Sequence, residues 1–341
     1  MSTRILVGDC RVTLPTLPER SVRCCVTSPP YWGLRDYGHG DQIGLESTPD
    51  AYVAEMVAVF REVRRVLTDD GTLWLNLGDS YCNTNGFARA SKEYQRKGRN
   101  DAPANDRNLD ALHGAGFKTK DLIGIPWRVA FALQADGWYL RSDIIWNKPN
   151  PMPESVTDRP TKAHEYVFLL SKSAQYYYDA AAIAEPVAPS TVSRLAQDVD
   201  AQEGSHRVPG KTNGAMKAVP PRFGGSKYGD NAASHHRTAS GNAYEIGDGT
   251  RNARTVWSIT TKPYSGAHFA TMPPELAERC VKAGSAAGDT ILDPFGGAGT
   301  TALVADRLGR DAILCELNPT YAGLAEQRVT NDSPLFSEVI R

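Results

Sequence analysis

The 341-residue chain has no apolar run that approaches the roughly 20 residues that a membrane-spanning helix needs. Its N-terminus, MSTRILVGDC, holds three apolar residues in a row before Gly8, which predicts a strand rather than a secretory signal peptide. We therefore expect no membrane partner and a cytoplasmic location. Hydrophobic residues make up 41% of the chain and charged residues 23%, values typical of a globular protein with one large domain or two smaller ones.

The chain also lacks any C-x-x-C pair among its six cysteines. Cys24 and Cys25 are adjacent, and the other four are scattered along the sequence. A zinc site or a disulfide framework would need regular spacing, so we expect neither, and no metal. Most of the cysteines are predicted to be small residues of the core.

A large excess of either charge is missing too, since the formal net charge is −1. Two segments differ from this average. Residues 86–120 hold eight Lys and Arg against four Asp and Glu, and residues 201–241 hold six against two, so each carries +4. Such a local balance suits contact with a polyanion, although solvated loops can have the same composition.

Strand-like runs alternate with helical patterns along most of the chain. Helices are predicted over residues 53–67 and 276–281, where apolar side chains recur at helical spacing, and from Pro319 onward with Asn318 as N-cap. The alternation predicts an α/β sheet with parallel strands. The predicted strands are residues 5–7, 22–27, 72–77, 140–146, 166–170, 290–292 and 312–315.

Two stretches, residues 84–118 and 186–254, interrupt this alternation. They are rich in Gly, Ala and Asn, with Lys and Arg in the first and Ser in the second, and show little periodicity. An irregular stretch of that length in a compact domain is usually functional or disordered.

A glycine-rich turn stands in DTILDPFGGAGTTALVADRLGRDAILCELNPTY (289–321), which reads as strand, turn, helix and a second strand ending in Glu316. A phosphate-binding P-loop would need a lysine after the glycines, where this chain has Thr300 and Thr301. A dinucleotide site fits better, because residues 297–302 match G-x-G-x-x-A and Glu316 is placed to hold ribose hydroxyls.

S-adenosylmethionine is a further ligand that this turn could bind, since glycines and a carboxylate serve it in the same way. It carries a cationic methionine end instead of a pyrophosphate, so an acidic residue is expected ahead of the glycines. Asp293, in the string Asp293-Pro294-Phe295, supplies that acid. A tight turn without a ligand is the simplest alternative.

A second unusual stretch is TSPPYWG (27–33), which follows directly on a predicted strand. Its two prolines fix the backbone twice and remove two amide donors. Tyr31 and Trp32 come next, where a loop is usually polar. Taken alone, the string reads as a rigid loop with chance aromatic residues.

Together the two stretches resemble the motifs of the amino-group DNA methyltransferases in their permuted, β-type arrangement. In that family [DNS]-P-P-[YFW] is the catalytic motif and D-P-F-x-G-x-G-T-T the cofactor motif, which appear here as TSPPY and DPFGGAGTT in the β-type order. Residues 145–173, 268–285 and 315–321 are similar to further segments of the family, and LVGDC (6–10) resembles its adenine-binding turn. The matches cover most of the chain outside the two irregular stretches.

The resemblance implies a Rossmann-like, S-adenosylmethionine-dependent methyltransferase sheet, circularly permuted, with a largely irregular target-recognition insertion. Residues 1–185 would form the catalytic half, 186–254 the target-recognition region, and 255–341 the cofactor-binding half of the same domain.

The resemblance also implies three sets of site residues. The catalytic residues would be Ser28, Pro29, Pro30 and Tyr31. The cofactor would be held by Asp9, Cys10, Thr27, His268, Phe269, Asp293, Pro294, Phe295, Gly296, Gly297, Gly299, Thr301, Glu316 and Leu317. DNA would be contacted by Trp32, Lys148, Lys211, Arg222 and the lysine of the Ser226-Lys227 pair.

In the implied mechanism, the Ser28 side chain and the Pro29 carbonyl accept the amine hydrogens of a flipped base on which Tyr31 stacks. Serine before the prolines goes more often with cytosine N4 in this family and Asp or Asn with adenine N6, so we prefer cytosine N4 and keep adenine N6 as the alternative. The chain has no Pro-Cys dipeptide, which argues against covalent methylation at cytosine carbon 5.

Double-stranded DNA is the expected partner, with a cognate restriction endonuclease as a genetic rather than a physical one. Monomer and homodimer both stay open. A nicotinamide dehydrogenase would leave TSPPY and DPF unexplained, and a non-catalytic nucleic-acid-binding module would leave the acceptors for an amine unexplained.

Overall fold

The computed structural model describes residues 1–34, 39–82, 109–188, 190, 250–261, 272–332 and 338–340. The chain divides into two compact units, Met1–Ala182 with Arg254–Arg341, and Ile183–Ala253. In the second unit, β6 (Glu185–Pro186) and β7 (Thr250–Arg251) form an antiparallel pair. No helix in the described part of the chain has the length and apolar character to cross a bilayer.

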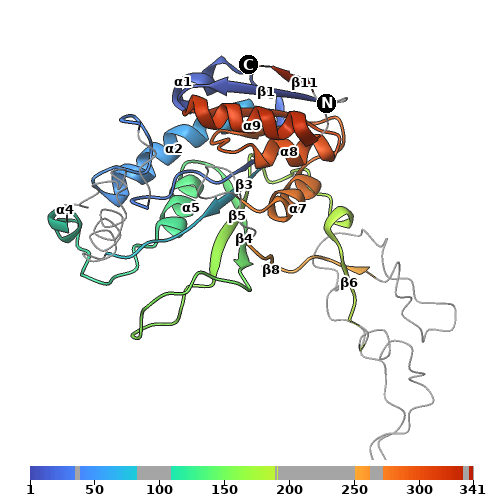
Figure 1. The fold of residues 1–341 in the computed structure, drawn as a ribbon. Helices are drawn as coiled ribbons and strands as arrows, with labels where there is room; N and C mark the ends of the chain where they lie inside the picture. Colours follow the sequence, from blue (N-terminus) through green and yellow to red (C-terminus); the bar gives the residue numbers. More distant parts are fainter. Residues whose placement is uncertain are drawn as a thin grey trace, which may run out of the picture. The chain divides into compact units, whose positions relative to one another are not determined.

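A nine-stranded sheet with the order β11-β1-β10-β9-β2-β3-β5-β4-β8 forms the centre of the first unit (Figure 1). Each of the seven predicted strands is present, because the buried apolar runs that predicted them fill the middle of this sheet. The α/β prediction is confirmed. The strands are β1 (Ser2–Val7), β2 (Val22–Thr27), β3 (Leu67–Leu77), β4 (Tyr139–Asn147), β5 (His164–Ser171), β8 (Val256–Ser258), β9 (Thr290–Asp293), β10 (Asp311–Glu316) and β11 (Glu338–Ile340).

One strand departs from the expected parallel arrangement. β5 runs antiparallel to both β3 and β4, while the other pairings in this sheet are parallel. Between β4 and β5 the described residues 148–163 contain no helix, so the chain turns straight back instead of crossing over. The start of β5 therefore lies at the same edge of the sheet as the ends of the parallel strands.

Two groups of helices cover the sheet. α2 (Pro49–Val66) packs against α5 (Ile125–Ala135), and α7 (Pro274–Gly284) packs against α8 (Thr300–Arg307), which in turn packs against α9 (Pro319–Asp332). Figure 1 shows the two groups on either side of the central strands.

The helix boundaries follow from their sequences. α2 begins where the Thr48 hydroxyl accepts a hydrogen bond from the Ala51 amide at 3.2 Å, with Pro49 in the first turn. α9 begins in the same way, because the Asn318 side chain accepts from the Thr320 amide at 2.9 Å. The N-cap predicted at Asn318 is confirmed.

Three of the described α-helices were not predicted, among them the four-residue α1 (Cys10–Thr13). α5 is apolar on most of its circumference, so its sequence has little helical periodicity. The short α4 (Leu109–Gly114) falls inside residues 84–118, which were expected to be irregular throughout. That expectation is wrong for α4, and the larger part of the stretch lies outside the described residues.

The two ends of the chain meet in the sheet. β1, the first strand, pairs in parallel with β10 on one side and with β11, the last strand, on the other. Figure 1 shows β1 and β11 side by side. The N-terminal strand thus completes the half of the sheet that otherwise comes from the C-terminal residues, as the permuted arrangement requires.

Gly299, at the start of α8, lies close against α9. This residue has φ 73° and caps the N-terminus of α8. A Cβ atom at this position would lie 2.7 Å from the Cβ of Ala325 on α9. Glycine is therefore required for both the left-handed backbone and the packing of the two helices.

We expect Gly299→Ala to lower the free energy of unfolding by about 2–4 kcal/mol, because it combines left-handed strain with overpacking. Gly40→Ala is the matched control, since Gly40 is exposed, has no positive φ and would place its Cβ more than 4 Å from any described neighbour. Urea denaturation of both variants measures the difference. Equal stabilities for the two variants would contradict the packing argument.

Candidate functional site

A cavity of about 960 Å³, counting its open mouth, lies at the carboxyl ends of β1, β10, β9 and β2. β9 continues through α8 to β10 on one side of the sheet, and its neighbour β2 continues through α2 to β3 on the other. Strands whose connections diverge in this way open the crevice in which α/β proteins bind ligands.

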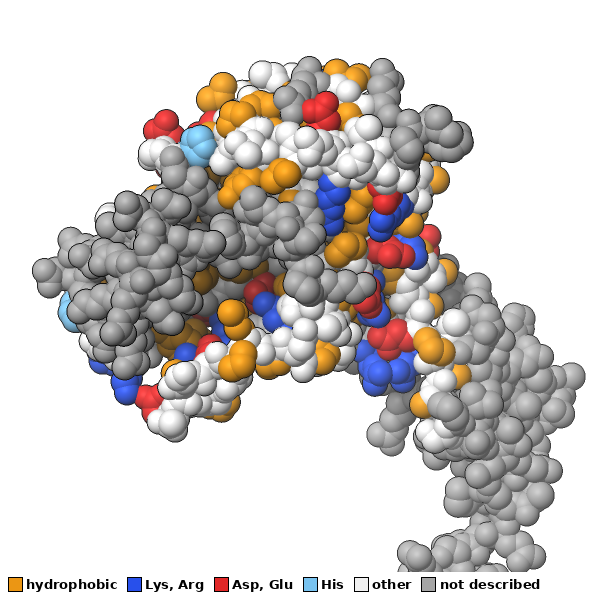
Figure 2. Space-filling view, viewed as in Figure 1, with side chains coloured by type: hydrophobic (Ala, Val, Ile, Leu, Met, Phe, Trp, Pro, Cys, Tyr) orange, Lys and Arg blue, Asp and Glu red, His pale blue; other side chains and the backbone are white. Residues whose placement is uncertain are grey.

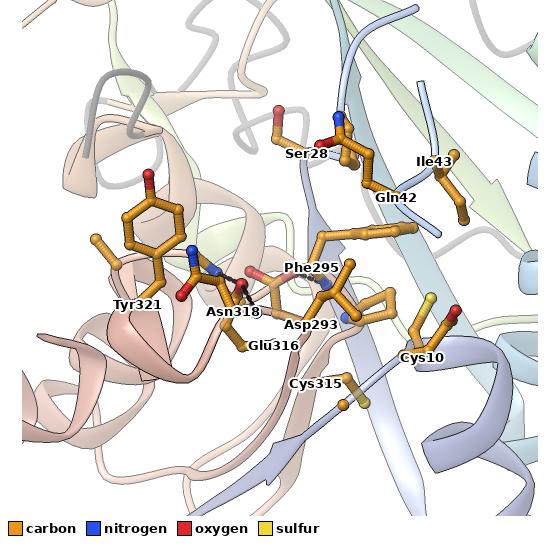
Figure 3. Close-up of a pocket in the computed structure, with 18 of the residues that line it drawn as sticks. Cys10, Ser28, Gln42, Ile43, Asp293, Phe295, Cys315, Glu316, Asn318 and Tyr321 are labelled. Carbon is orange, nitrogen blue, oxygen red and sulfur yellow. Dashed lines mark hydrogen bonds between the residues drawn. The ribbon is translucent and has the colours of Figure 1, made fainter. Parts of the chain in front are cut away.

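Most of the described residues predicted for the site line this cavity (Figure 3). Thr27, Pro29, Tyr31 and Gly299 do not. The predicted residues that line it are Asp9, Cys10, Ser28, Pro30, Asp293, Pro294, Phe295, Gly296, Gly297, Thr301, Glu316 and Leu317.

Asp293 joins three elements beneath the cavity. Its carboxylate accepts hydrogen bonds from the Thr27 hydroxyl on β2 at 2.6 Å and from the Thr301 hydroxyl on α8 at 2.8 Å, and also from the Phe295 amide at 3.0 Å. Burial raises the pKa of Asp293, and these hydrogen bonds oppose the shift. Thr27, predicted to touch the cofactor, instead holds Asp293 in place from behind.

Glu316 forms one wall of the cavity at the end of β10. Its carboxylate accepts hydrogen bonds from the Gly297 amide at 2.7 Å and the Asn318 amide at 2.8 Å. Burial raises the pKa of Glu316, and the two backbone hydrogen bonds oppose the rise. A carboxylate has about four lone-pair sites, so Glu316 can accept further hydrogen bonds from a ligand in the cavity.

Asp9 lies at the end of β1 and caps α1 (Cys10–Thr13). Its carboxylate accepts from the Arg11 amide at 2.8 Å and forms an ion pair with the Arg11 guanidinium at 2.6 Å. Burial acts to raise the pKa of Asp9, but the hydrogen bonds and charge of Arg11 outweigh it, and the pKa is lowered. Asp9 is therefore ionised at neutral pH.

In the corner after β2, the backbone carbonyls of Pro29 and Pro30 differ in their hydrogen bonding. The Pro30 carbonyl accepts a hydrogen bond from the Tyr52 hydroxyl of α2 at 2.9 Å. No hydrogen bond from a described residue reaches the Pro29 carbonyl. The half-buried Ser28 side chain lies at the rim of the cavity, as Figure 3 shows.

The Tyr31 hydroxyl points to the neighbouring strand ends rather than into the cavity. It accepts a hydrogen bond from the Ser28 hydroxyl at 3.2 Å and donates to the Glu165 carboxylate at 2.7 Å. Burial, and then the charge of Glu165, raise the pKa of the Tyr31 hydroxyl well above its ordinary value. Its ring lies so close to Gly78 that a Cβ there would be 2.5 Å from Cε2 of Tyr31.

Two residues predicted to contact DNA lie near this corner. Trp32 is 2% exposed, belongs to the hydrophobic core and donates its indole N–H to the Glu46 carbonyl at 2.9 Å. The structure thus assigns Trp32 to the core beneath the corner, which corrects the expectation of DNA contact. Lys148, after β4, pairs with Glu165, and its ammonium lies 4.4 Å from the centroid of the Trp146 ring.

The remaining predicted contacts cannot be placed. His268 and Phe269, and Lys211, Arg222 and Lys227, lie outside the described residues. Their predicted roles stay predictions.

Several lining residues were not predicted. Figure 3 shows Gln42 and Ile43 on one side of the cavity and Asn318 and Tyr321 on the other. The second pair directly follows β10, so the strand-end rule could have found it. The first pair belongs to the connection between β2 and α2, whose path the sequence does not predict. The other unpredicted lining residues are Gly8, His39, Asp41, Met272, Ala298, Thr300 and Cys315.

The cysteines of the chain offer no exposed thiol. All six lie in the described ranges and are free and buried, as predicted for core residues. Burial raises the pKa of Cys315, which lines the cavity, to about 11. Among the described residues, no group of three or more His, Cys, Asp and Glu could hold a metal ion.

Comparison with protein families gives a match to the model described as DNA methylase (N6_N4_Mtase) over residues 22–327. The chain is 45% identical to the Type II methyltransferase M.XycI of Xanthomonas campestris pv. cyanopsidis, over 98% of this chain and 89% of that protein. It is 44% identical to the Type II methyltransferase M.SmaI of Serratia marcescens, over 96% of this chain and 91% of that protein.

Two solved structures share the fold. TTHA0409 of Thermus thermophilus, complexed with S-adenosyl-L-methionine, is 24% identical with a TM-score of 0.57, covering 99% of this chain and 98% of that one. The cytosine-N4-specific PvuII DNA methyltransferase is 17% identical with a TM-score of 0.59, covering 100% of this chain and 95% of that one.

Proposed function

The chain belongs to the DNA methylase family of the N6/N4 class, and we propose that it methylates the exocyclic N4 amine of a cytosine flipped out of duplex DNA. S-adenosyl-L-methionine is the methyl donor. The N6 amine of adenine is the alternative target. The observation that carries the proposal is that Ser28 and Glu316, far apart in the sequence, line one cavity at the β2–β9 crevice.

The lining of the cavity fits this donor. Glu316 offers free lone pairs for ribose hydroxyls, and the apolar side chains of Phe295 and Ile43 offer surfaces for a purine ring. The backbone at Gly297 has φ 49°, which glycine adopts without a steric penalty and which leaves no side chain between the turn and a ligand. Asp293, buried ahead of the glycines, supplies the acidic residue expected for a ligand with a cationic methionine end.

When bound, S-adenosylmethionine supplies a methyl group that its sulfonium already activates. The protein still has to activate the target amine, because the lone pair of that amine is delocalised into the base. The Ser28 hydroxyl and the Pro29 carbonyl accept the two amine hydrogens and draw the nitrogen toward a tetrahedral shape. Because β2 and two prolines hold these acceptors, little reorganisation remains at the moment of transfer.

The choice of base rests on the residue before the prolines. Ser28 is a neutral hydroxyl, and serine in this place goes more often with cytosine N4 in the family. A covalent route at carbon 5 is disfavoured, because it needs a cysteine nucleophile. All six cysteines are buried, and burial raises the pKa of Cys315, which lines the cavity, to about 11.

DNA contacts are proposed mainly for residues 84–118 and 186–254, most of which lie outside the described residues. In the part that Figure 2 colours, Lys and Arg side chains alternate with Asp and Glu. Among the described residues, ion pairs such as Lys120 with Asp158 at 2.6 Å neutralise cations. We therefore keep residues 186–254 as the proposed target-recognition region, with a cognate restriction endonuclease as the genetic partner.

The test is to incubate the purified protein with S-adenosylmethionine and unmethylated bacterial genomic DNA, digest the DNA to nucleosides and analyse them by mass spectrometry. We expect N4-methylcytosine to accumulate. N6-methyladenine without N4-methylcytosine would overturn the choice of base. Calorimetric binding of NAD instead of S-adenosylmethionine would favour the dehydrogenase alternative over the whole proposal.

A further inference from the structure

A chain of hydrogen bonds leads away from Ser28 across three strand ends. The Ser28 hydroxyl donates to the Tyr31 hydroxyl, which donates to Oε2 of Glu165 at the start of β5. The ammonium of Lys148, at the end of β4, pairs with Oε1 of the same carboxylate. Because β5 runs antiparallel, its first residues come to the edge where β2 and β4 end.

The direction of this chain is fixed by its far end. A carboxylate only accepts hydrogen bonds and an ammonium only donates them, so the hydrogen of Tyr31 must point toward Glu165. Asn76 on β3 acts in the same sense. Its Nδ2 donates to Glu165 at 3.2 Å and to the Tyr166 carbonyl at 3.1 Å, which leaves its Oδ1 as an acceptor 3.1 Å from the Tyr31 hydroxyl.

The direction of these hydrogen bonds also determines whether Ser28 donates or accepts. Its hydroxyl has one hydrogen and two lone pairs, and the hydrogen is used on the Tyr31 oxygen. The remaining capacity of Ser28 is therefore that of an acceptor, which is what the hydrogens of an exocyclic amine need. Without a fixed direction, the same hydroxyl could equally turn its hydrogen toward the amine.

We propose that Glu165, held by Lys148 and acting through Tyr31, is a positioning residue that sets Ser28 as the hydrogen-bond acceptor for the target amine. The inference rests on the proposed function. It also explains why a serine at this position needs support, since an aspartate there would accept hydrogen bonds without help.

Two lysine side chains lie close to Glu165. Lys148 lies on one side, and Lys162, in the connection before β5, lies near enough for its charge and that of Glu165 to interact. The Lys162 ammonium is buried with no hydrogen-bond partner among the described residues, and burial lowers its pKa, while the charges of Asp79 and Glu165 oppose this. Glu165 is thus held by the ion pair with Lys148 and by the hydrogen bonds that it accepts from Tyr31 and Asn76.

Glu165→Gln is the direct test, because a glutamine keeps the shape of the side chain but removes the carboxylate at the far end of the chain. Its carbonyl would turn to the ammonium of Lys148 and its amide would face Tyr31, so the Tyr31 hydroxyl would lose its charged acceptor and the direction of its hydrogen would no longer be fixed by Glu165. We expect the single-turnover rate of tritium transfer from labelled S-adenosylmethionine to unmethylated genomic DNA to fall about 10- to 100-fold, the effect of one hydrogen bond to a charged group.

Two further variants separate positioning from folding. Tyr31→Phe keeps the ring and the Glu165–Lys148 pair but breaks the chain of hydrogen bonds. Its single-turnover rate should therefore fall to a similar extent. Asp158→Asn removes the exposed Lys120–Asp158 pair in the same connection between β4 and β5 and should keep the wild-type rate. Calorimetry should give unchanged S-adenosylmethionine affinity for all three variants.

The deciding measurement is Glu165→Gln in a Ser28→Ala background. If Glu165 acts through Ser28, the second substitution adds no further loss. An equal loss in both backgrounds would show a structural role and overturn the inference, as would a wild-type rate in Glu165→Gln or Tyr31→Phe. A wild-type protein that transfers no methyl group to DNA would instead overturn the proposed function itself.

Discussion

Ser28→Ala should lower the rate of methyl transfer to DNA about 100- to 1,000-fold, the cost of removing one preorganised group at a reacting centre. The alanine leaves the backbone and the Pro29 carbonyl in place, so one of the two acceptors for the amine remains. It also leaves the wall formed by Glu316 and the glycine turn intact. Affinity for S-adenosylmethionine should therefore change less than about twofold. A substitution that removes no such feature usually changes a free energy by less than about 0.5 kcal/mol.

Single-turnover transfer of a tritiated methyl group, with calorimetry of cofactor binding, measures the two quantities separately. Ser47→Ala is the matched control, because Ser47 is exposed in the same connection between β2 and α2. It should keep the wild-type rate. If Ser28→Ala retained most of its activity, the amine would not depend on this hydroxyl and the role proposed for Ser28 would be wrong.

Glu316→Ala should weaken binding of S-adenosylmethionine about 10- to 100-fold, the effect of losing hydrogen bonds to a charged acceptor. Two consequences of the structure combine in this variant. The ligand loses a carboxylate for its hydroxyls, and the amides of Gly297 and Asn318 lose the acceptor that fixes the turn and the start of α9.

Isothermal titration of the apo protein with S-adenosylmethionine gives this affinity directly. Glu275→Ala is a suitable control, because Glu275 is an exposed carboxylate on α7 whose contact with Arg279 is a long 3.7 Å. The control should bind as the wild type does. Unchanged affinity in Glu316→Ala, with the fold intact by circular dichroism, would remove Glu316 from the cofactor site.

Much of this architecture can be predicted from the sequence, because its signals are local. Buried apolar runs mark β2 and β9, and polar residues directly after them, such as Ser28 and Asp293, must meet at one edge of a parallel sheet. The convergence of these residues on one cavity therefore needs no knowledge of the loops.

What could not be predicted depends on tertiary context. The apolar ring of Trp32 looks like an exposed aromatic in the sequence, yet the path of the connection buries it in the core. The reversal of β5 is equally invisible, because an antiparallel and a parallel buried strand have similar composition. The partnership of Tyr31 with Glu165 follows from that reversal, so only the structure brings the two together.

The central claim is that Ser28 activates the N4 amine of a cytosine at one DNA sequence. Methylation-sensitive sequencing of DNA from a methylation-free bacterial host that expresses either the wild-type chain or Ser28→Ala tests it most directly. The account predicts N4-methylcytosine at a single recurrent sequence in the first host and its loss in the second. Modified adenine, or the same modification in both hosts, would contradict it.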